Sequence, residues 1–282
     1  MTKRSWTADE ILKTGLTWLA LAIAVIWTLF PVYWIVITSL KSNAELAKAT
    51  PSFFPPIIVL EGYKTVLGRG IPHMALNSVV VATGTTVVAL ALAIPGSYGL
   101  TRLGLPRRVG APVSQVIGFA TMFPAIAIVV PLFALAVKLQ IYDRLGTLIA
   151  LNVPFNAAFA VWVLRTVWMD VPRDIEEAAL LDGDTRLTAF RRVLLPMMMP
   201  SLIAIAVLIF IFTWNEYLFA LIFTTSERAM TLPLGVAGQI PQHELSWSIV
   251  AAAGTLALIP VIVATVLLQS YLVRGLTFGL AK

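Results

Sequence analysis

Six long apolar segments, separated by short polar stretches, constrain the fold of this 282-residue chain more than any other feature. At about 1.5 Å rise per residue, a helix over any of them is longer than the ~30 Å hydrocarbon core of a bilayer. A soluble domain of this length has no core large enough to hide a sequence that is 59% hydrophobic and only 12% charged. We therefore predict an all-α polytopic membrane protein with six transmembrane helices, over residues 14–40, 74–101, 111–137, 147–169, 200–224 and 248–273.

The basic residues set the expected orientation of these helices. Three basic residues precede the first apolar segment, which is longer than the hydrophobic region of a signal peptide and is interpreted as a retained span. We expect residues 1–13 to be a cytoplasmic N-terminus and residues 14–282 to form a single six-helix transmembrane domain. With both termini cytoplasmic, thirteen of the twenty Lys and Arg residues lie inside, as the positive-inside rule favours. Loop 170–199 then faces the cytoplasm, and loop 225–247 is external.

The polar stretch between the fourth and fifth segments reads as two short helices joined at Gly183. Pro172 stands where a helix can begin, acidic residues fill the next turns, and Gly183 suits a left-handed helix C-cap. Thr185 can cap the second helix, which Arg191 and Arg192 close. A polar helix–turn–helix held between two spans has the shape to be gripped by a soluble partner. Apolar residues at helical spacing form one side of the second helix: Leu187, Phe190, Val193 and Leu194.

Charged and amide side chains inside the spans indicate either a pathway or contacts between helices. A charge at the centre of a span costs roughly 2.5 to 3.5 kcal/mol on insertion scales, so such residues usually face a cavity or a partner. Amide and carboxylate groups beside aromatic rings suit a hydroxyl-bearing ligand such as a sugar. Interhelical hydrogen bonds explain the same residues at least as well. The substrate-pathway candidates are Asn152, Asn156, Trp214, Asn215, Glu216 and Tyr217.

Several kinds of chemistry lack the residues they need in this sequence. Cysteine is absent, and His73 and His243 have no partner at ligand spacing, so no metal site is predicted. No Gly-x-x-x-x-Gly-Lys-Ser/Thr phosphate loop occurs, so this chain is not expected to bind ATP and its Mg²⁺ itself. Paired carboxylates, paired histidines and a nucleophile elbow are missing, and no catalytic residue or cofactor is expected in this chain.

The polar loop carries the first resemblance to a known family. The spacing Glu177-Ala178-Ala179, three residues, Gly183, nine residues, Val193, one residue, Leu195-Pro196 resembles the EAA loop of permease subunits of binding-protein-dependent ABC importers. Val193 stands where that pattern favours Ile. In the family this loop is the coupling helix, which seats in a groove of the cytoplasmic ATPase. The resemblance implies ATPase-coupling roles for Glu176, Glu177, Ala178, Ala179, Asp182, Gly183, Phe190 and Pro196.

Other runs are similar to the smaller, six-span permease of maltose-type carbohydrate importers. They are residues 212–221, 231–235 and 269–277. The chain departs from the family at Gly96-Ser97-Tyr98-Gly99, where an alanine-richer pattern is usual, and at Phe278 and Leu280 in a tail that would lie near the ATPase. The resemblance implies that segment 235–241 reaches into the sugar-binding protein, with contact candidates Gly235, Gly238, Gln239 and Pro241.

The resemblance implies a permease subunit that moves a sugar or sugar derivative into the cytoplasm, driven by ATP hydrolysis on a partner through the loop around Glu177. The expected partners are a second homologous permease, a homodimeric cytoplasmic ATPase, an external or periplasmic sugar-binding protein and the lipid of the cell inner membrane, but no nucleic acid. Two alternatives remain open. One is an ABC permease for a polyol or glycerol phosphate, and the other is a proton-coupled secondary transporter that uses Glu216.

Overall fold

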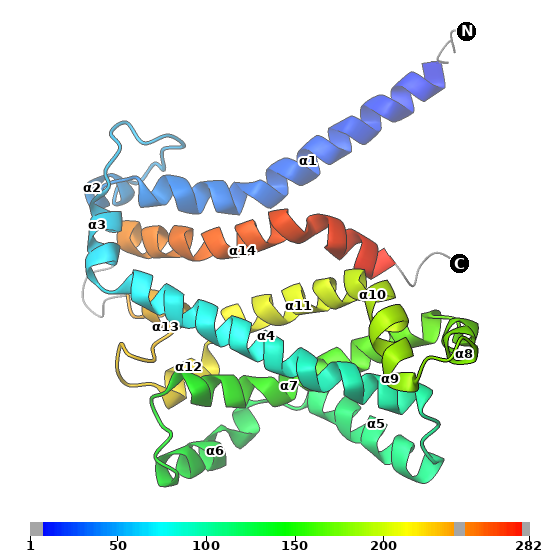
Figure 1. The fold of residues 1–282 in the computed structure, drawn as a ribbon. Helices are drawn as coiled ribbons and strands as arrows, with labels where there is room; N and C mark the ends of the chain where they lie inside the picture. The colour runs from blue at the N-terminus through cyan, green and yellow to red at the C-terminus, as the bar shows by residue number, and fades with distance from the viewer. Residues whose placement is uncertain (1–7, 240–245, 278–282) are drawn as a thin grey trace. The chain divides into compact units, whose positions relative to one another are not determined.

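The computed structural model describes residues 8–239 and 246–277, and helices are the only regular secondary structure within these ranges. The chain divides into two compact units: unit 1 comprises residues 1–69 and 238–256, and unit 2 comprises residues 70–237 and 257–282. Unit 1 holds α1 (Ala8–Ser39), α2 (Asn43–Leu46), α3 (Glu61–Gly68) and the first turns of α14 (Trp247–Thr277) (Figure 1).

Unit 1 is held together near the C-terminal end of α1. The Ser39 hydroxyl lies 2.7 Å from the hydroxyl of Tyr63 on α3, which ties these helices together. On the other side of α3, Gly62 lies so close to α14 that an added Cβ would come within 2.8 Å of the Ser248 carbonyl oxygen. The apolar stretch of α1 has no buried residue, as a helix that faces lipid or another subunit would have.

Unit 2 contains the remaining helices, in chain order α4 (Ile71–Arg102), α5 (Arg107–Met122), α6 (Ile126–Lys138), α7 (Leu145–Asp170), α8 (Arg173–Leu181), α9 (Arg186–Ala189), the π-helix η1 (Phe190–Leu194), α10 (Leu195–Met197), α11 (Met199–Trp214), α12 (Leu218–Phe223) and α13 (Leu232–Ala237), with the rest of α14. The helices α4 and α7 pack along each other, and α11 packs on α4. Small residues on α4, including Ala89 and Ala93, are fully buried, and this permits a close approach between the helices.

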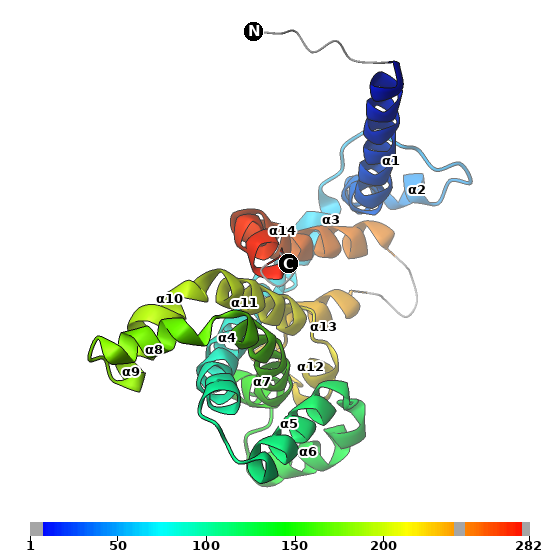
Figure 2. The same cartoon turned by 90° about the vertical axis from the view of Figure 1, so that its right-hand side faces the viewer.

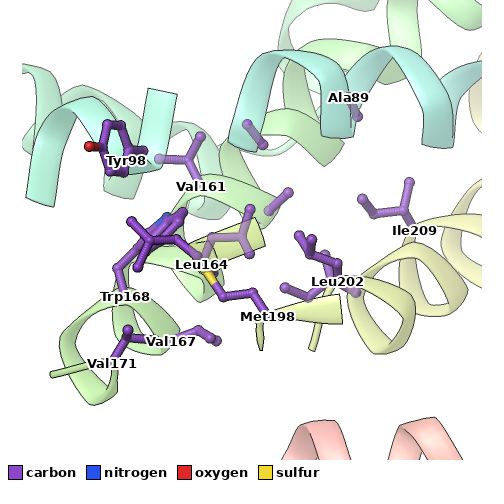
Figure 3. Close-up of a cluster of buried hydrophobic side chains, with 14 residues drawn as sticks. Ala89, Tyr98, Val161, Leu164, Val167, Trp168, Val171, Met198, Leu202 and Ile209 are labelled. Carbon is purple, nitrogen blue, oxygen red and sulfur yellow. The ribbon is translucent and has the colours of Figure 1, made fainter. Parts of the chain in front are cut away.

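The core of unit 2 extends from this helix pair toward the end that carries α8 and α9. Figure 3 shows Tyr98 of α4, Trp168 of α7 and Met198 beside α11 within one cluster of buried side chains. Trp168 and Leu164 are fully buried there. A second cluster, which includes Val81, Leu148 and Phe223, joins α4, α6, α7 and α12. The polar loop 170–199 is therefore attached to the main core of unit 2.

Four of the six predicted spans are confirmed as long apolar helices: residues 12–39, 71–102, 145–170 and 247–269 are each long enough to cross a bilayer. The count reaches six if each of two bent helix pairs forms one span. The prediction of a single helix over 111–137 is wrong, because α5 and α6 meet at 95°. Figure 2 shows α5 and α6 as two separate helices. Phe123 is extended before Pro124, as the ring of a proline imposes on the preceding residue, so the helix ends there.

The fifth predicted segment is also interrupted. The helix α11 ends at Trp214, and the short α12 begins at Leu218, so the polar residues between them stand outside both helices. At its other end α11 meets the helical stretch 186–197 at 73°, where Met198 separates the two. Hydropathy identified an apolar segment here but not its breaks.

Candidate functional site

The polar loop of unit 2 folds as the predicted pair of helices. Pro172 precedes α8, and Gly183 follows it with φ +97°, a left-handed conformation that favours glycine. The Gly183 N–H donates to the Leu180 carbonyl at 3.2 Å, and the Asp184 N–H donates to the Ala179 carbonyl at 3.1 Å. These two bonds form a Schellman motif, which satisfies the last carbonyls of α8. The predicted C-cap at Gly183 is confirmed.

The second helix of the loop begins as predicted but continues further. The Thr185 hydroxyl accepts a hydrogen bond from the Thr188 N–H at 3.3 Å, which confirms the N-cap. The prediction that Arg191 and Arg192 close the helix is wrong, because helical backbone runs through η1 and α10 to Met197. The π-turn of η1 directly precedes Pro196, whose ring removes one backbone donor and would clash with the carbonyl four residues earlier in a regular α-helix.

The apolar side of this second helix is only partly packed. Leu194 is fully buried, and Phe190 lies with its ring centroid 4.8 Å from that of Tyr98. Leu187, by contrast, is 57% exposed, and Leu181 at the end of α8 is 89% exposed. Two large apolar side chains are therefore exposed to solvent beside the turn at Gly183. Such exposure is typical of a surface that a partner covers.

The loop is joined to α4 by contacts that the sequence analysis did not predict. The Tyr98 hydroxyl donates a 2.6 Å hydrogen bond to Oε1 of Glu176 on α8, and both side chains are buried. The Ser97 hydroxyl accepts a 3.0 Å hydrogen bond from the indole N–H of Trp168. Arg102 donates to the carbonyl oxygens of Trp168, at 2.6 Å, and of Val171. The available signal was the departure from the family pattern at residues 96–99.

The predicted coupling residues divide into an exposed and a buried set. Glu177, Ala178, Asp182, Gly183 and Pro196 are exposed and accessible to a partner. Glu176 and Ala179 are buried, and Phe190 is half-buried against α4 and α7. A pocket of about 200 Å³ is lined by members of both sets, and its charged lining is Arg102, Arg173, Glu176, Glu177 and Arg186. Glu176 therefore faces Tyr98, whereas Glu177 remains free to meet another chain.

The amide candidates on α7 satisfy their donors within their own helix. Both Asn152 and Asn156 are buried, with Nδ2 donating to the Leu148 carbonyl at 2.9 Å and to the Asn152 carbonyl at 3.0 Å respectively. The nearby cavity of about 380 Å³, formed by α5, α6 and α7, is lined only by apolar residues such as Phe119, Phe123 and Phe155. A hydroxyl-rich ligand needs hydrogen-bonding groups that this cavity does not offer.

The candidates around Glu216 lie in the break between α11 and α12. The Glu216 carboxylate accepts hydrogen bonds from the backbone N–H of Phe219 at 2.7 Å and of Ala220 at 3.2 Å. These are first-turn donors of α12, so Glu216 acts as a helix-capping side chain. Trp214 is buried and stacks on Phe210 with ring centroids 6.0 Å apart. Asn215 and Tyr217 are exposed.

The segment before α13, which the sequence analysis expects to be external, is fastened to the N-terminal end of α4. Nδ2 of the buried Asn77 lies 2.9 Å from the Met230 carbonyl oxygen, and the carbonyls of Glu227 and Arg228 lie at 3.3 and 3.2 Å. The Ser78 hydroxyl accepts a 2.8 Å hydrogen bond from the Leu232 N–H.

Asp143, between α6 and α7, makes a second attachment to the segment before α13. Its carboxylate accepts hydrogen bonds from the Thr225 N–H at 2.9 Å, the Ser226 N–H at 3.2 Å and the Ser226 hydroxyl at 2.5 Å. Burial by itself raises the pKa of Asp143, but these hydrogen bonds outweigh it and hold the pKa below the ordinary value. The carboxylate form is therefore the one that holds the loop.

The candidates for contact with a binding protein have mixed positions. Gly235 is buried on α13, and an added Cβ would lie 2.3 Å from the sulphur of Met74. Gln239 is buried and accepts a 2.9 Å hydrogen bond from Arg69. Gly238 is exposed, whereas Pro241 and the tail residues Phe278 and Leu280 lie outside the described residues. Within those residues no group of three His, Asp or Glu side chains has the arrangement to hold a metal ion.

Comparisons with known proteins agree with this architecture. The family model described as binding-protein-dependent transport system inner membrane component matches residues 88–278. The probable ABC transporter permease y4oR of Sinorhizobium fredii is 36% identical over 99% of this chain and 98% of its own length. The trehalose/maltose permease MalG of Thermococcus litoralis is 31% identical over 97% of this chain and 99% of its own.

A solved structure supports the same fold. One chain of a bacterial ABC transporter involved in the import of the acidic polysaccharide alginate superposes with a TM-score of 0.76, at 21% identity, over 95% of this chain and 99% of that chain. The relatives are transport permeases and not enzymes. The chain therefore belongs to the family of binding-protein-dependent transport system inner membrane components, as a multi-pass membrane subunit that works with a binding protein and an ATPase.

Proposed function

We propose that this chain is one of two homologous permease subunits of an ABC importer for a sugar or sugar derivative. The observation that carries the coupling part of this proposal is the capped helix pair α8–α9, which leaves Glu177 exposed next to a left-handed turn at Gly183. Local hydrogen bonds hold the shape of this pair, so a partner can push or pull it without first ordering it.

The relatives support the carbohydrate class. MalG of Thermococcus litoralis is named for trehalose and maltose, and SugB of Mycobacterium tuberculosis, 32% identical over 91% of this chain, is named for trehalose. SmoH of Agrobacterium fabrum, 31% identical over 94% of this chain, is named for sulfoquinovosyl glycerol. Since these substrates differ while the relatives remain about equally similar to this chain, the class follows from the resemblance but the individual sugar does not.

The proposed mechanism is alternating access driven from the cytoplasm. Two ATPase subunits bind ATP and Mg²⁺, close on each other and move the loop around Glu177, which rotates the spans and opens the pathway to a docked sugar-binding protein. Both chain termini then lie in the cytoplasm. This chain supplies no catalytic group. Its contribution is a surface for the ATPase, formed by Glu177, Asp182 and the exposed Leu181 and Leu187.

Purification of the chain from its native membrane, followed by reconstitution in lipid, tests this proposal. We expect an ATPase and a homologous permease to co-purify, and ATP hydrolysis to rise when a binding protein with its sugar is added. Glu177→Lys should leave the complex in the membrane but uncouple hydrolysis from uptake. Glu61→Lys is the matched control, because it reverses an exposed charge in the first turn of α3, outside the loop. Normal uptake by Glu177→Lys, or purification of the chain alone even after cross-linking at position 177, would overturn the proposal.

A further inference from the structure

The helix α4 makes side-chain contacts near both of its ends with the segments that the two soluble partners are proposed to reach. It has 32 residues, and at about 1.5 Å per residue it is roughly 48 Å long, which exceeds the ~30 Å hydrocarbon core. Its ends therefore reach both surfaces of the membrane. The two sets of contacts involve different loops, one before α13 and one that contains α8.

At the inner end, the attachment is a short hydrogen bond in a buried setting. Tyr98 donates to Glu176 at 2.6 Å, and its ring packs edge-on against Trp168 with a centroid distance of 5.3 Å (Figure 3). A hydrogen bond to a carboxylate is about twice as strong as one between neutral groups. Because Glu176 directly precedes the exposed Glu177 on α8, a force applied at Glu177 reaches α4 through this contact.

Helix stiffness alone does not hold this end of α4. Pro95 lies one turn before Tyr98 and removes a backbone donor from α4. The contacts of Ser97 with Trp168 and of Tyr98 with Glu176 lie directly beyond that point. They fasten the last turns of the helix to α7 and α8 where the backbone is weakest.

At the outer end, α4 holds the segment that leads into α13. The buried Asn77 amide lies within 3.3 Å of three carbonyl oxygens, and Ser78 accepts the Leu232 N–H at 2.8 Å. The buried Met74 packs against Gly235 of α13. A shift of α4 along or about its axis therefore moves the external segment as well, because two successive turns of the helix contact it.

We propose that α4 transmits motion between the coupling loop and the external segment 225–239, and that Tyr98 and Asn77 are the positioning residues that fix its two ends. This inference rests on the proposed function, since it assumes that the ATPase acts on α8 and the binding protein on the external segment. It also gives a role to the departure from the family pattern at Tyr98, which a helix that only spans the membrane does not need.

The test uses the complete reconstituted complex and compares ATP hydrolysis with and without the sugar-loaded binding protein. Tyr98→Phe removes only the hydroxyl, and Asn77→Ala removes the amide. Both should reduce stimulation by the binding protein at least about fivefold, the lower range of typical allosteric coupling, while basal hydrolysis and the amount of assembled complex stay at the parent level. Glu176→Gln keeps an acceptor oxygen and should retain stimulation, whereas Glu176→Leu should lose it. Thr86→Val is the matched control, because the Thr86 hydroxyl bonds only to the Ala82 carbonyl of α4 itself.

A double variant distinguishes a shared contact from two separate defects. Tyr98→Phe combined with Glu176→Leu should be no worse than the more severe single change, because both remove the same hydrogen bond. Full stimulation in Tyr98→Phe overturns the inference, and so does a loss of stimulation that merely follows loss of assembled complex. If Glu177→Lys is uncoupled while Tyr98→Phe is normal, only the role of α4 fails. Normal uptake by Glu177→Lys would refute the proposed function as well as the role of α4.

Discussion

Substitution of Glu216 distinguishes a helix cap from a proton relay. Its carboxylate oxygens accept from Phe219 and Ala220, two donors of α12 that have no acceptor within the helix. A buried donor left without a partner costs about 1 to 3 kcal/mol, so Glu216→Ala should weaken the α12 region by about 2 to 6 kcal/mol. Glu216→Gln keeps one acceptor oxygen and should lose about half as much.

The assay combines thermal unfolding of the reconstituted complex with ATP-driven uptake of the sugar, in the presence and absence of a protonophore. We expect thermal stability to fall in the order parent, Glu216→Gln, Glu216→Ala, with uptake following stability and insensitive to the protonophore. Asn215→Ala is the control, because Asn215 is exposed and, within the described residues, its amide donates to the Ile211 carbonyl of the preceding α11. It should resemble the parent in both measurements.

One combination of results refutes the capping role. If Glu216→Gln abolishes uptake while its unfolding temperature equals that of the parent, the charge matters and not the acceptor. If a protonophore also collapses uptake by the parent at constant ATP, the carboxylate serves as a proton relay. The transporter is then proton-coupled, and the proposed ATPase-coupling role of the loop around Glu177 is refuted.

The two glycines of α3 should respond oppositely to alanine. Gly62→Ala places a Cβ 2.8 Å from a carbonyl oxygen, about 0.7 Å short of a normal ~3.5 Å contact, and should lower the free energy of unfolding by about 1 to 3 kcal/mol. Gly68→Ala meets open space and should raise the free energy of unfolding by up to about 1 kcal/mol. Equal unfolding temperatures for the two variants would contradict this packing. Gly183→Ala should lower the free energy of unfolding by about 1 to 2 kcal/mol, because alanine disfavours the left-handed backbone conformation at this position. Hydrogen exchange of residues 180–186 should become faster in Gly183→Ala, and the increase should be smaller in Gly183→Asn. The folded-state pKa of Asp143 is lowered, so its stabilisation is complete above the unfolded value of about 3.9 and lost as pH falls through the folded value. Protease access to loop 225–239 should rise below about pH 3.9 in the parent, while Asp143→Asn should show no such pH dependence.

The features predicted correctly were those with a local cause. The Schellman turn depends on a glycine in a left-handed conformation, and the Thr185 cap depends on a hydroxyl three residues before an N–H. Both lie within a few residues of one another in the chain. The break after Trp214 was missed because a hydropathy window averages over the positions where a helix stops.

The predicted sites illustrate the same limit. Glu216 and Asn156 were identified as polar groups within apolar segments, and in the structure both bond to backbone groups a few residues away. Gly235, a candidate for contact with a binding protein, is buried against Met74. Burial depends on which helix covers a residue, and composition does not contain that information.

By itself, the sequence determined that this chain is a helical membrane protein with a capped polar loop, because hydropathy and capping energies act over one helix turn or one span. It also carried the spacing that identified the family. Only the tertiary structure decided that Tyr98 meets Glu176, 78 residues away, and that Asn77 meets Met230, 153 residues away. These pairs form because α4 packs along α7 and beside α13, and the crossing of helices is a property of all their buried surfaces together.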